Sequence, residues 1–393
     1  MTRILFEEWY NPPFGGADEM AEEIRKYINK VYDGISIDKI AGSNSVTESD
    51  KAIYTTKKGD INLDLDTVYY TIRDNYDIIH AHCTGDKISN LNNKLNKPLV
   101  YTAHSLVIRE LETISKAPIS DLKKHPAAKK QEKMMKQSEV ITTPSNYIAN
   151  LIKTYYPEYY NKVKVIPNST SFIKYKKNKH IESRSKQIRK KYSPNGEKLI
   201  AYVGRITKDK GVYELADAFK ELVESGENIK LYYIGPYYED SMKEINRRLR
   251  GYEYHYMFTG QLGKEELAAW YKAVDSVIIP THHESFSIVG LETLSMETPL
   301  IISDIDGPKE ILIDEGLAVG ITPKDTKAIK NGIKYVIDNY NYEKKRAQIA
   351  SKYIKDHYSI DKIVPEWVNL YKDILFQNKY SGVSVKKFSN IIT

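Results

Sequence analysis

Short apolar runs that end in polar residues recur along the chain, and amphipathic segments separate them. About four to eight apolar residues bounded by turn residues are typical of a buried strand, whereas apolar residues three and four apart are typical of a helix. The first pair is a strand over residues 4–9 and a helix over 17–31. The further predicted strands are residues 77–82, 98–104, 140–144, 163–167, 198–204, 229–235, 254–260, 276–280 and 299–304, and the last helix is predicted over 360–377.

This alternation indicates parallel, doubly wound sheets, in which helices connect the strands and cover both faces. A chain of 393 residues is too long for one core, because single cores stop growing at roughly 250–300 residues. We therefore predict an α/β protein of two Rossmann-like domains facing a cleft, with domains over 1–173 and 198–375 and a basic linker over 174–197. Ligands of such sheets bind at the carboxyl ends of the strands, so the chemistry is expected in strand-to-helix loops.

The positive charge of the chain is concentrated in one place. The formal net charge is +7, yet residues 174–191 hold nine Lys or Arg and one acid, so the other residues together carry −1. A protein that binds duplex DNA needs a broad positive face, so nucleic acid is disfavoured as a partner. This stretch and residues 121–136, with six lysines and two acids, are either solvated surfaces or attract an anionic membrane or a charged polymer.

A single cysteine, Cys83, excludes a disulfide framework and fits a reducing compartment. The first apolar run is short and acids interrupt it, which is unlike a signal peptide. No window approaches the roughly 18 apolar residues of a membrane span. We therefore expect a cytoplasmic protein, whose contact with a membrane, if it makes one, is peripheral and at the inner face.

The loop after the strand at 198–204 has the residues of a phosphate site. Arg205 stands at the strand end, and Lys210 precedes the next helix. A helix N-terminus offers unpaired N–H groups and positive potential, and the two side chains add a planar fork and a point charge. Together they are able to stabilise a departing diphosphate without a metal ion. The alternative is a solvated basic turn.

A second loop, after the strand at 276–280, holds two carboxylates eight residues apart, Glu284 and Glu292. A carboxylate in the loop is able to accept hydrogen bonds from sugar hydroxyls, and one within the helix is able to reach a ribose diol. The alternative is a capped helix with two surface acids. The residues between them, which start the helix and offer amides to an anion, are Ser285, Phe286, Ser287 and Ile288.

Two smaller features lie in the first domain. Gly15 and Gly16 follow the first strand and let the backbone approach a ligand closely, although a plain turn has the same composition. The pattern G-x-G-x-x-G is absent from this turn, which argues against a nicotinamide enzyme. His104 ends the strand at 98–104, where it either hydrogen-bonds a sugar hydroxyl or serves the core.

Two pairs of residues resemble metal ligands. His80 and His82 lie on the same face of one strand, and Asp304 and Asp306 form an Asp-x-Asp sequence. Neither pair has a supporting set of ligands, so we expect no metal ion and no cofactor.

Taken together, the motifs resemble the retaining glycosyltransferases of family 4, which have the GT-B fold. The resemblance covers most of the chain, in the order of the family. The matching segments are FGGA at 14–17, DIIHAH at 77–82, VYTAH at 100–104, ITTPSNYI at 141–148, VKVIPNST at 163–170, YVGRITKDKGVYELADAF at 202–219 and ESFSIVGLE at 284–292, the last with the E-x7-E spacing.

The resemblance implies roles by position. In the first domain, Gly15 and Gly16 would approach the donor phosphates, and His104 would contact the donor sugar near its C6 hydroxyl. The tail over residues 376–393 would pack back on that domain, because the last helix of the family commonly crosses back. In the second domain, the implied roles are diphosphate binding by Arg205 and Lys210, sugar binding by Glu284, ribose binding by Glu292, and a sugar-phosphate pocket completed by amides around Phe286, Ser287 and Ile288.

Three positions depart from the family pattern. Ser287 stands where the family usually has glycine, which bears on the local backbone geometry. Asn168-Ser169 replaces Asn-Gly in the segment that closes the first domain, and Glu297-Thr298-Pro299 replaces Gly-Lys-Pro. None of these changes removes a charged group from the expected site.

The resemblance thus implies a metal-independent retaining transferase that takes a sugar from a nucleotide-sugar donor, with UDP favoured, to a glycan, a lipid-linked acceptor or another hydroxyl. The donor's departing phosphate oxygen would serve as the base. Three alternatives stay open: a non-catalytic GT-B binding subunit of another transferase, a DNA-modifying glycosyltransferase, and a phosphorylase, for which 393 residues is short.

Overall fold

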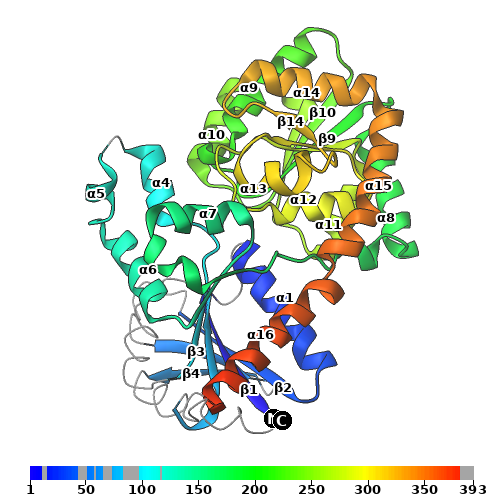
Figure 1. Cartoon of the computed structure of the whole chain (residues 1–393). Helices are drawn as coiled ribbons and strands as arrows, with labels where there is room; N and C mark the ends of the chain where they lie inside the picture. The colour runs from blue at the N-terminus through cyan, green and yellow to red at the C-terminus, as the bar shows by residue number, and fades with distance from the viewer. Residues whose placement is uncertain are drawn as a thin grey trace, which may run out of the picture. The chain divides into compact units, whose positions relative to one another are not determined.

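Two compact units make up the protein (Figure 1). The structure, a computed structural model, describes residues 1–10, 16–42, 51–56, 59–64, 73–82, 97–115 and 117–380. Unit 1 comprises Met1–Pro167 and Ile360–Thr393, and unit 2 comprises Asn168–Ser359. Unit 2 is therefore an insertion within the sequence of unit 1.

Unit 1 is built on an eight-stranded sheet in the order β4-β3-β2-β1-β5-β6-β7-β8. The strands from β2 to β8 along this order pair in parallel, whereas β3 and β4 extend the β2 edge as an antiparallel hairpin. The strands are β1 Thr2–Tyr10, β2 Ile35–Gly42, β3 Lys51–Thr56, β4 Gly59–Asp64, β5 Ile78–Ala81, β6 Leu99–Thr102, β7 Val140–Thr143 and β8 Val163–Val165. The helices of unit 1 include α1 Gly16–Val31, α4 Val107–Ile114, α5 Ile119–Leu122, α6 Pro126–Gln137, α7 Asn146–Tyr155 and α16 Ile360–Tyr380.

Unit 2 is built on a six-stranded sheet in the order β11-β10-β9-β12-β13-β14, and every pairing is parallel. Its strands are β9 Lys198–Val203, β10 Ile229–Ile234, β11 Tyr256–Gly260, β12 Ser276–Ile279, β13 Leu300–Ser303 and β14 Val319–Ile321. Its helices include α8 Lys179–Tyr192, α9 Val212–Glu224, α10 Glu239–Arg248, α11 Lys264–Ala273, α12 Ile288–Ser295, α13 Asp306–Pro308, α14 Thr326–Asp338 and α15 Tyr340–Tyr358.

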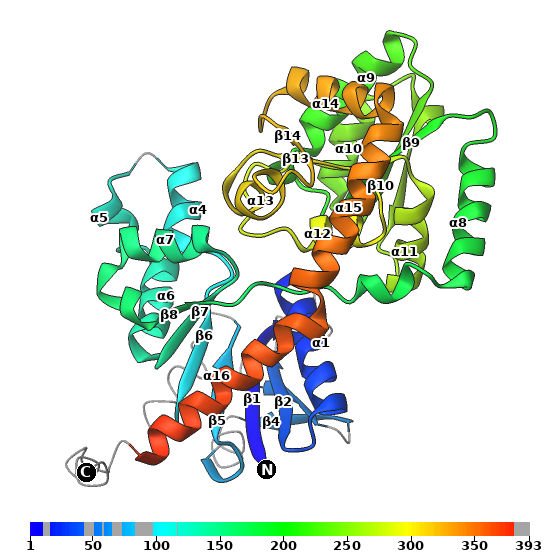
Figure 2. The same ribbon diagram turned by 45° about the vertical axis from the view of Figure 1, so that its right-hand side comes forward.

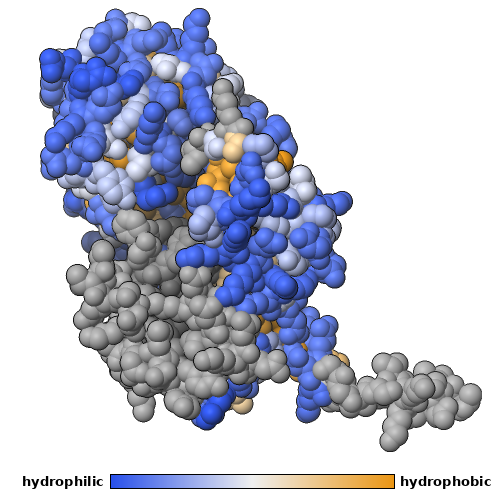
Figure 3. Space-filling model, turned by 90° about the vertical axis from the view of Figure 1, so that its left-hand side faces the viewer, coloured by the Kyte–Doolittle hydropathy of each residue, from blue (hydrophilic) through white to orange (hydrophobic). Residues whose placement is uncertain are grey.

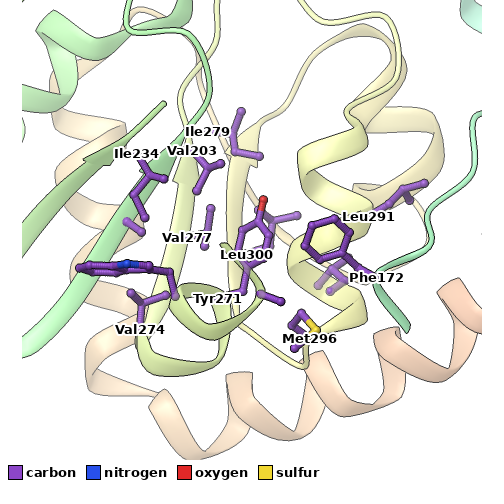
Figure 4. Packing of buried hydrophobic residues seen from close by; sticks show 14 of the residues in the cluster. Phe172, Val203, Ile234, Tyr271, Val274, Val277, Ile279, Leu291, Met296 and Leu300 are labelled. Carbon is purple, nitrogen blue, oxygen red and sulfur yellow. The ribbon is translucent and has the colours of Figure 1, made fainter. Parts of the chain in front are cut away.

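The central strands of unit 2 are apolar on both faces, which is why helices cover both faces. Successive side chains of a strand point to opposite faces. Along β9, Leu199 and Val203 pack with α11 and α12 in one cluster, and Ile200 packs with α9 and α14 in the other. Figure 4 shows the first of these clusters, where residues of β9, β10 and β12 meet those of the covering helices. A continuous apolar run therefore specifies a doubly wound sheet.

The predicted fold class is confirmed, and most predicted strands agree with the structure to within one or two residues. The sequence pattern missed β2, β14 and the β3–β4 hairpin. The hairpin lies at the edge of the sheet, and lysine, aspartate and threonine interrupt its sequence so that no apolar run exceeds three residues. A strand at the edge of a sheet need not be apolar on both of its faces. The search for continuous apolar runs, which finds strands covered on both faces, therefore does not find it.

The segment 174–197, predicted as a linker, instead belongs to unit 2 (Figure 2). Most of it, Lys179–Tyr192, forms α8, which packs on α11 through the buried side chains of Ile181 and Ile188. Arg184 forms a two-bond ion pair with Glu266 of α11, with N–O distances of 2.8 Å. The high charge of the stretch obscured an apolar stripe at helical spacing. The first domain accordingly ends at Pro167 and not at residue 173.

The last helix returns to unit 1 earlier than predicted. Residues 360–375 were expected in the second domain, but unit 1 begins again at Ile360. Helix α16 lies beside α1, where the Tyr27 hydroxyl donates to Asp361 (Figure 1). The described part of the tail also packs on unit 1, because the Asn378 amide donates to Glu139 at 3.1 Å. Residues 381–393 lie outside the part of the chain that the structure describes.

Both points where the chain passes between the units are held together in unit 2. The Thr170 N–H donates to the Tyr358 carbonyl at 2.9 Å, and Thr170 forms a parallel bridge with Ser359. The entering and leaving segments therefore lie side by side.

A partly buried ion cluster joins α1 to β2 in unit 1. The Glu22 carboxylate lies 2.8 Å from Arg25 and 3.4 Å from Lys39, and Lys39 is itself buried. Burial alone would raise the pKa of Glu22, but Arg25, Lys39 and Lys26 lower that pKa to about 2. The charged form of Glu22 therefore stabilises the fold.

We predict that Glu22→Gln destabilises unit 1 by about 3 kcal/mol at pH 7, because its pKa is below the ordinary 4.5 in the folded state. Because its pKa is depressed, the Glu22 carboxylate stabilises the folded state fully above about pH 4.5, and this stabilisation disappears as the pH falls toward 2. Hydrogen exchange of peptides from α1 and β2, measured at several urea concentrations, gives the difference between variant and wild type. A difference that stays constant down to pH 2.5 would contradict this role.

Candidate active site

Three loops of unit 2 meet at the carboxyl ends of neighbouring strands. They span residues 204–211 after β9, 280–287 after β12 and 304–307 after β13, and these strands are adjacent in the sheet. The His282 N–H donates to the Asp209 carbonyl at 2.9 Å, and the Gly307 N–H donates to the Glu284 carbonyl at 3.3 Å. The middle loop is thus bonded through its backbone to both of its neighbours.

Two glycines allow this close approach. A Cβ on Gly211 would lie 1.9 Å from the Pro280 carbonyl oxygen, and one on Gly307 would lie 2.0 Å from the Ser285 carbonyl oxygen. Real Cβ atoms do not approach backbone oxygens so closely, so any side chain would force the loops apart. Gly211 also has φ +70°, in the left-handed region that glycine adopts without cost.

The meeting of the loops brings Lys210 and Glu284 together. The Lys210 Nζ lies 3.1 Å from the Glu284 Oε2, and both side chains are half-buried. Lys210 comes from the β9 loop and Glu284 from the β12 loop, 74 residues later. The sequence predicted both residues for one site, and the structure places them in direct contact.

Arg205 lies in the same loop as Lys210 and is exposed. Its backbone is held from below, because the Tyr202 hydroxyl donates to the Arg205 carbonyl at 2.6 Å. Burial raises the pKa of Tyr202, so this hydroxyl keeps its proton. The guanidinium makes no ion pair with any residue that the structure describes, and it is available to an anion.

Ser287 adopts the backbone conformation that a glycine would favour. It has φ 78° and ψ 81°, in the left-handed region, which costs a non-glycine residue about 1–2 kcal/mol. Its Oγ accepts the Gly290 N–H at 3.2 Å and so caps the N-terminus of α12. The departure from the family pattern at this position therefore leaves the helix start intact. The N-cap bond offsets part of the backbone cost.

Glu292 lies within α12 and is buried. Its Oε2 accepts a hydrogen bond from the Tyr271 hydroxyl at 2.9 Å. Tyr271 is part of the apolar cluster drawn in Figure 4, which also contains Leu300 and Val274. The Glu292 carboxylate is thus held by the core, unlike the exposed acid of the alternative interpretation. Ser285 and the buried Phe286 lie in the turn after Glu284, and Ile288 begins α12.

The predicted site residues of unit 1 lie at its own strand ends. Gly16 begins α1, whereas Gly15 lies outside the described residues. His104 follows β6 and is half-buried, and burial lowers its pKa to about 4. Its Nε2 lies 3.2 Å from the Nδ1 of His82.

The candidate metal ligands form no cation site. Within the described ranges, no group of three or more His, Cys, Asp or Glu side chains is arranged to hold an ion. The Asp304 carboxylate instead lies 3.0 Å from Lys309, and Asp306 begins α13. His80 has both ring nitrogens bonded to hydroxyl groups, those of Tyr371 and Thr102.

Sequence reasoning did not single out Tyr202, Gly235 or Gly307. A Cβ on Gly235 would lie 2.1 Å from the Gly204 carbonyl oxygen, so this glycine lets the β10 loop approach the Arg205 loop. Gly235 is the last residue of its predicted strand and directly follows β10, as Gly204 directly follows β9. A glycine at a strand end was therefore an available signal, whereas the role of Tyr202 depends on a contact that the sequence does not show.

Two family models match the chain, one mainly over unit 1 and the other within unit 2. The model described as Glycosyltransferase Family 4 matches residues 63–171, and the model described as Glycosyl transferases group 1 matches residues 183–355. An uncharacterized glycosyltransferase of Methanocaldococcus jannaschii is 29% identical over 309 residues, which are 76% of each chain. A capsular polysaccharide biosynthesis glycosyltransferase of Staphylococcus aureus is 26% identical over 230 residues, which are 56% of this chain and 57% of the relative.

Solved structures share the fold of the whole chain. Sucrose-phosphate synthase from Thermosynechococcus elongatus has a TM-score of 0.75 at 16% identity, covering 95% of this chain and 99% of its own. The Anabaena protein HepE, in complex with UDP, has a TM-score of 0.72 at 16% identity, covering 95% of this chain and 100% of its own.

Two features of the structure concern contact with a membrane, namely the character of its helices and the hydropathy of its surface. Among the described helices, none combines the length and the apolar character that crossing a bilayer requires. On the face drawn in Figure 3, the described residues are mainly hydrophilic, with a small hydrophobic patch.

We predict that Ser287→Ala lowers the free energy of unfolding of unit 2 by about 1 kcal/mol. Ser287→Gly should change it by only about 0.3 kcal/mol. The alanine loses the cap and keeps the left-handed cost, while the glycine loses the cap and removes that cost. Thermal unfolding should show a decrease in Tm of roughly 3 °C for alanine alone. Equal losses in both variants would show that the backbone at this position carries no cost.

Proposed function

The chain belongs to the family 4 glycosyltransferases and has the GT-B fold, and from this premise we propose its chemistry. It takes a sugar from a nucleoside diphosphate sugar, with UDP favoured, and transfers it with retention to a hydroxyl of a glycan, a lipid or another acceptor. It does so without a divalent metal ion.

The contact between Lys210 and Glu284, beside the exposed Arg205, carries this proposal. When the bond between the anomeric carbon and the diphosphate breaks, negative charge develops on the departing oxygen. Two cations and the amides of nearby helix ends are able to stabilise that charge. The acceptor oxygen forms its bond to the same face of the sugar, and its proton passes to the departing phosphate oxygen.

The ion pair also suggests how the site changes when a donor binds. Glu284 neutralises Lys210 at a distance of 3.1 Å in the structure described here. A diphosphate competes with Glu284 for Lys210, and the released carboxylate then accepts hydrogen bonds from the sugar hydroxyls. Sugar binding by Glu284 is therefore coupled to diphosphate binding by Lys210.

The remaining predicted site residues complete the proposed donor site. Glu292, which the core holds through Tyr271, meets the ribose, and the amides around Phe286, Ser287 and Ile288 meet the sugar phosphate. For unit 1 the proposed roles are those that the resemblance implies, namely contact of His104 with the donor sugar and of Gly15 and Gly16 with its phosphates. Support for UDP comes from HepE, which was solved with UDP and with UDP-glucose. Starch Synthase IV of Arabidopsis thaliana, with the same fold, was solved with ADP. The fold therefore accepts either nucleobase, and uracil is proposed on the strength of HepE alone.

The acceptor is proposed only by class. A peripheral contact with an anionic membrane, or a charged acceptor, would use the lysines over 121–136 and on α8. On α8, ion pairs already engage Arg184, Lys186 and Arg189. The cations left to an anionic surface are therefore the exposed Lys179, Lys190 and Lys191.

We predict that Lys210→Ala lowers kcat/KM for the donor by at least about 100-fold while the protein stays folded, because it removes a cation that acts on the leaving group. Lys208→Ala is the matched control, since Lys208 lies in the same turn and is exposed. Release of nucleoside diphosphate from a panel of nucleotide sugars measures both variants. Wild-type turnover in the Lys210 variant would contradict the proposal that Lys210 stabilises the departing diphosphate.

Glu284→Gln should separate donor turnover from nucleotide affinity. The amide no longer neutralises Lys210, so UDP alone should bind as tightly as in wild type or more tightly. Turnover of the nucleotide sugar should fall by at least about tenfold, because hydrogen bonds to the sugar weaken. Calorimetry with UDP and the release assay give the two values, and a parallel loss of both would contradict the coupling.

We predict retention and metal independence in an assay that needs no acceptor. With a UDP-α-sugar, proton NMR should show the α-anomer of the hydrolysed sugar first, before mutarotation. Excess EDTA should leave the rate of UDP release unchanged, because side chains supply the positive charge. Initial appearance of the β-anomer would overturn retention, and loss of activity that magnesium restores would overturn metal independence.

A further inference from the structure

Three histidines gather at the ends of β5 and β6 in unit 1, and they differ in how their ring nitrogens are used. His80 is buried, and its two nitrogens are bonded to the Tyr371 hydroxyl at 2.8 Å and to the Thr102 hydroxyl at 2.7 Å. His104 is half-buried, and only its Nε2 is bonded, to His82. The Nδ1 of His104 makes no hydrogen bond within the part of the chain that is described.

His82 is held rigidly in the interior. Its ring centre lies 4.7 Å from that of Phe6 and 4.1 Å from that of His80, and its backbone N–H donates to the Glu7 carbonyl at 2.9 Å. The rings of His82 and His104 meet at their hydrogen-bonded edges, with centres 5.5 Å apart and planes inclined by 24°. His82 is therefore a fixed support against which the His104 ring rests.

The His82 and His104 rings are both uncharged near pH 7. Burial lowers the pKa of His82 well below its ordinary value, and the neighbouring His80 and His104 add to this effect. Burial likewise lowers the pKa of His104 to about 4. Two neutral rings share one proton in their hydrogen bond, so whichever ring donates, the Nε2 of His104 is occupied.

We propose that His82 is a positioning residue for the transfer reaction: it occupies the Nε2 of His104, so that the donor sugar meets the Nδ1 of His104. The inference rests on the proposed function, in which His104 contacts the sugar. A sugar hydroxyl both donates and accepts, so it is able to pair with Nδ1 in either tautomer. Without His82, the His104 ring is free to turn and to present either nitrogen.

A structural role alone would not require histidine at position 82. The His82 Nε2 is buried without a hydrogen-bond partner among the described residues, and such an atom costs stability. His82→Phe removes this atom along with the bond to His104, so the variant is expected to fold. A loss of activity in a folded His82→Phe protein therefore reports on positioning.

The experiment measures donor turnover and UDP affinity in four variants. His82→Phe and His104→Ala should each lower kcat/KM for the nucleotide sugar about tenfold, the effect of one hydrogen bond, and leave the Kd of UDP unchanged. His82→Asn should restore activity to within about threefold, because its amide is able to occupy the position of Nδ1. His80→Phe is the matched control, since it lies on the same strand and loses two hydrogen bonds without touching the bond to His104.

The double variant His82→Phe/His104→Ala decides whether the two residues act together. It should be no worse than His104→Ala alone, because His82 acts only through His104. Multiplied losses in the double variant, or wild-type activity in His82→Phe, would overturn the proposal.

Histidine ¹⁵N spectra give a readout that does not require turnover. In wild type, the Nε2 of His104 should show the chemical shift of a hydrogen-bonded nitrogen in whichever tautomer is populated, and His82→Phe should abolish that shift. A wild-type Nε2 without the hydrogen-bond signature would overturn the positioning role. If the spectra are as expected but no nucleotide sugar is turned over, the proposed function fails and the geometry of the histidine pair stands.

Discussion

Backbone-to-backbone contact between neighbouring loops is the constraint on which the site in unit 2 depends. The loops after β9, β12 and β13 meet so closely that Gly211 and Gly307 have no room for a side chain. This contact, and not the sequence proximity of the residues, sets Lys210 beside Glu284. The sheet below supplies the rigidity, because its strands are buried on both faces and their ends are fixed relative to one another.

The fold was predictable from the sequence because apolar strands and amphipathic helices give strong local signals. Where charge obscured such a signal, prediction failed: α8 was mistaken for a linker, although Ile181 and Ile188 mark its buried face. The early return of the chain at Ile360 was also not predictable from local pattern. A helix sequence shows which face is apolar but not which of two domains that face covers.

The candidate site was predictable as a set of residues but not as a geometry. The order of the motifs identified Arg205, Lys210, Glu284 and Glu292, and the structure adds the contacts that each one makes. The pairing of His82 with His104 depends on a contact between separate strands, which no local pattern encodes. The Tyr202 hydroxyl bonds the Arg205 carbonyl only three residues later, but periodicity does not show that this side chain turns back on its own loop. Ser287 shows the converse: the sequence flagged an unusual residue, and the structure shows that its hydroxyl caps the helix.

Because unit 2 is inserted within the sequence of unit 1, the two units complete their folding in a fixed order during synthesis on the ribosome. Unit 2 is one uninterrupted stretch, so all of its contacts exist once Ser359 has emerged. Unit 1 begins first but waits for α16, since the hydroxyl that bonds His80 belongs to Tyr371, 291 residues later. The half that is translated first is therefore completed last, and until then the residues of its sheet that contact α16, such as His80, are the surface that a chaperone would meet.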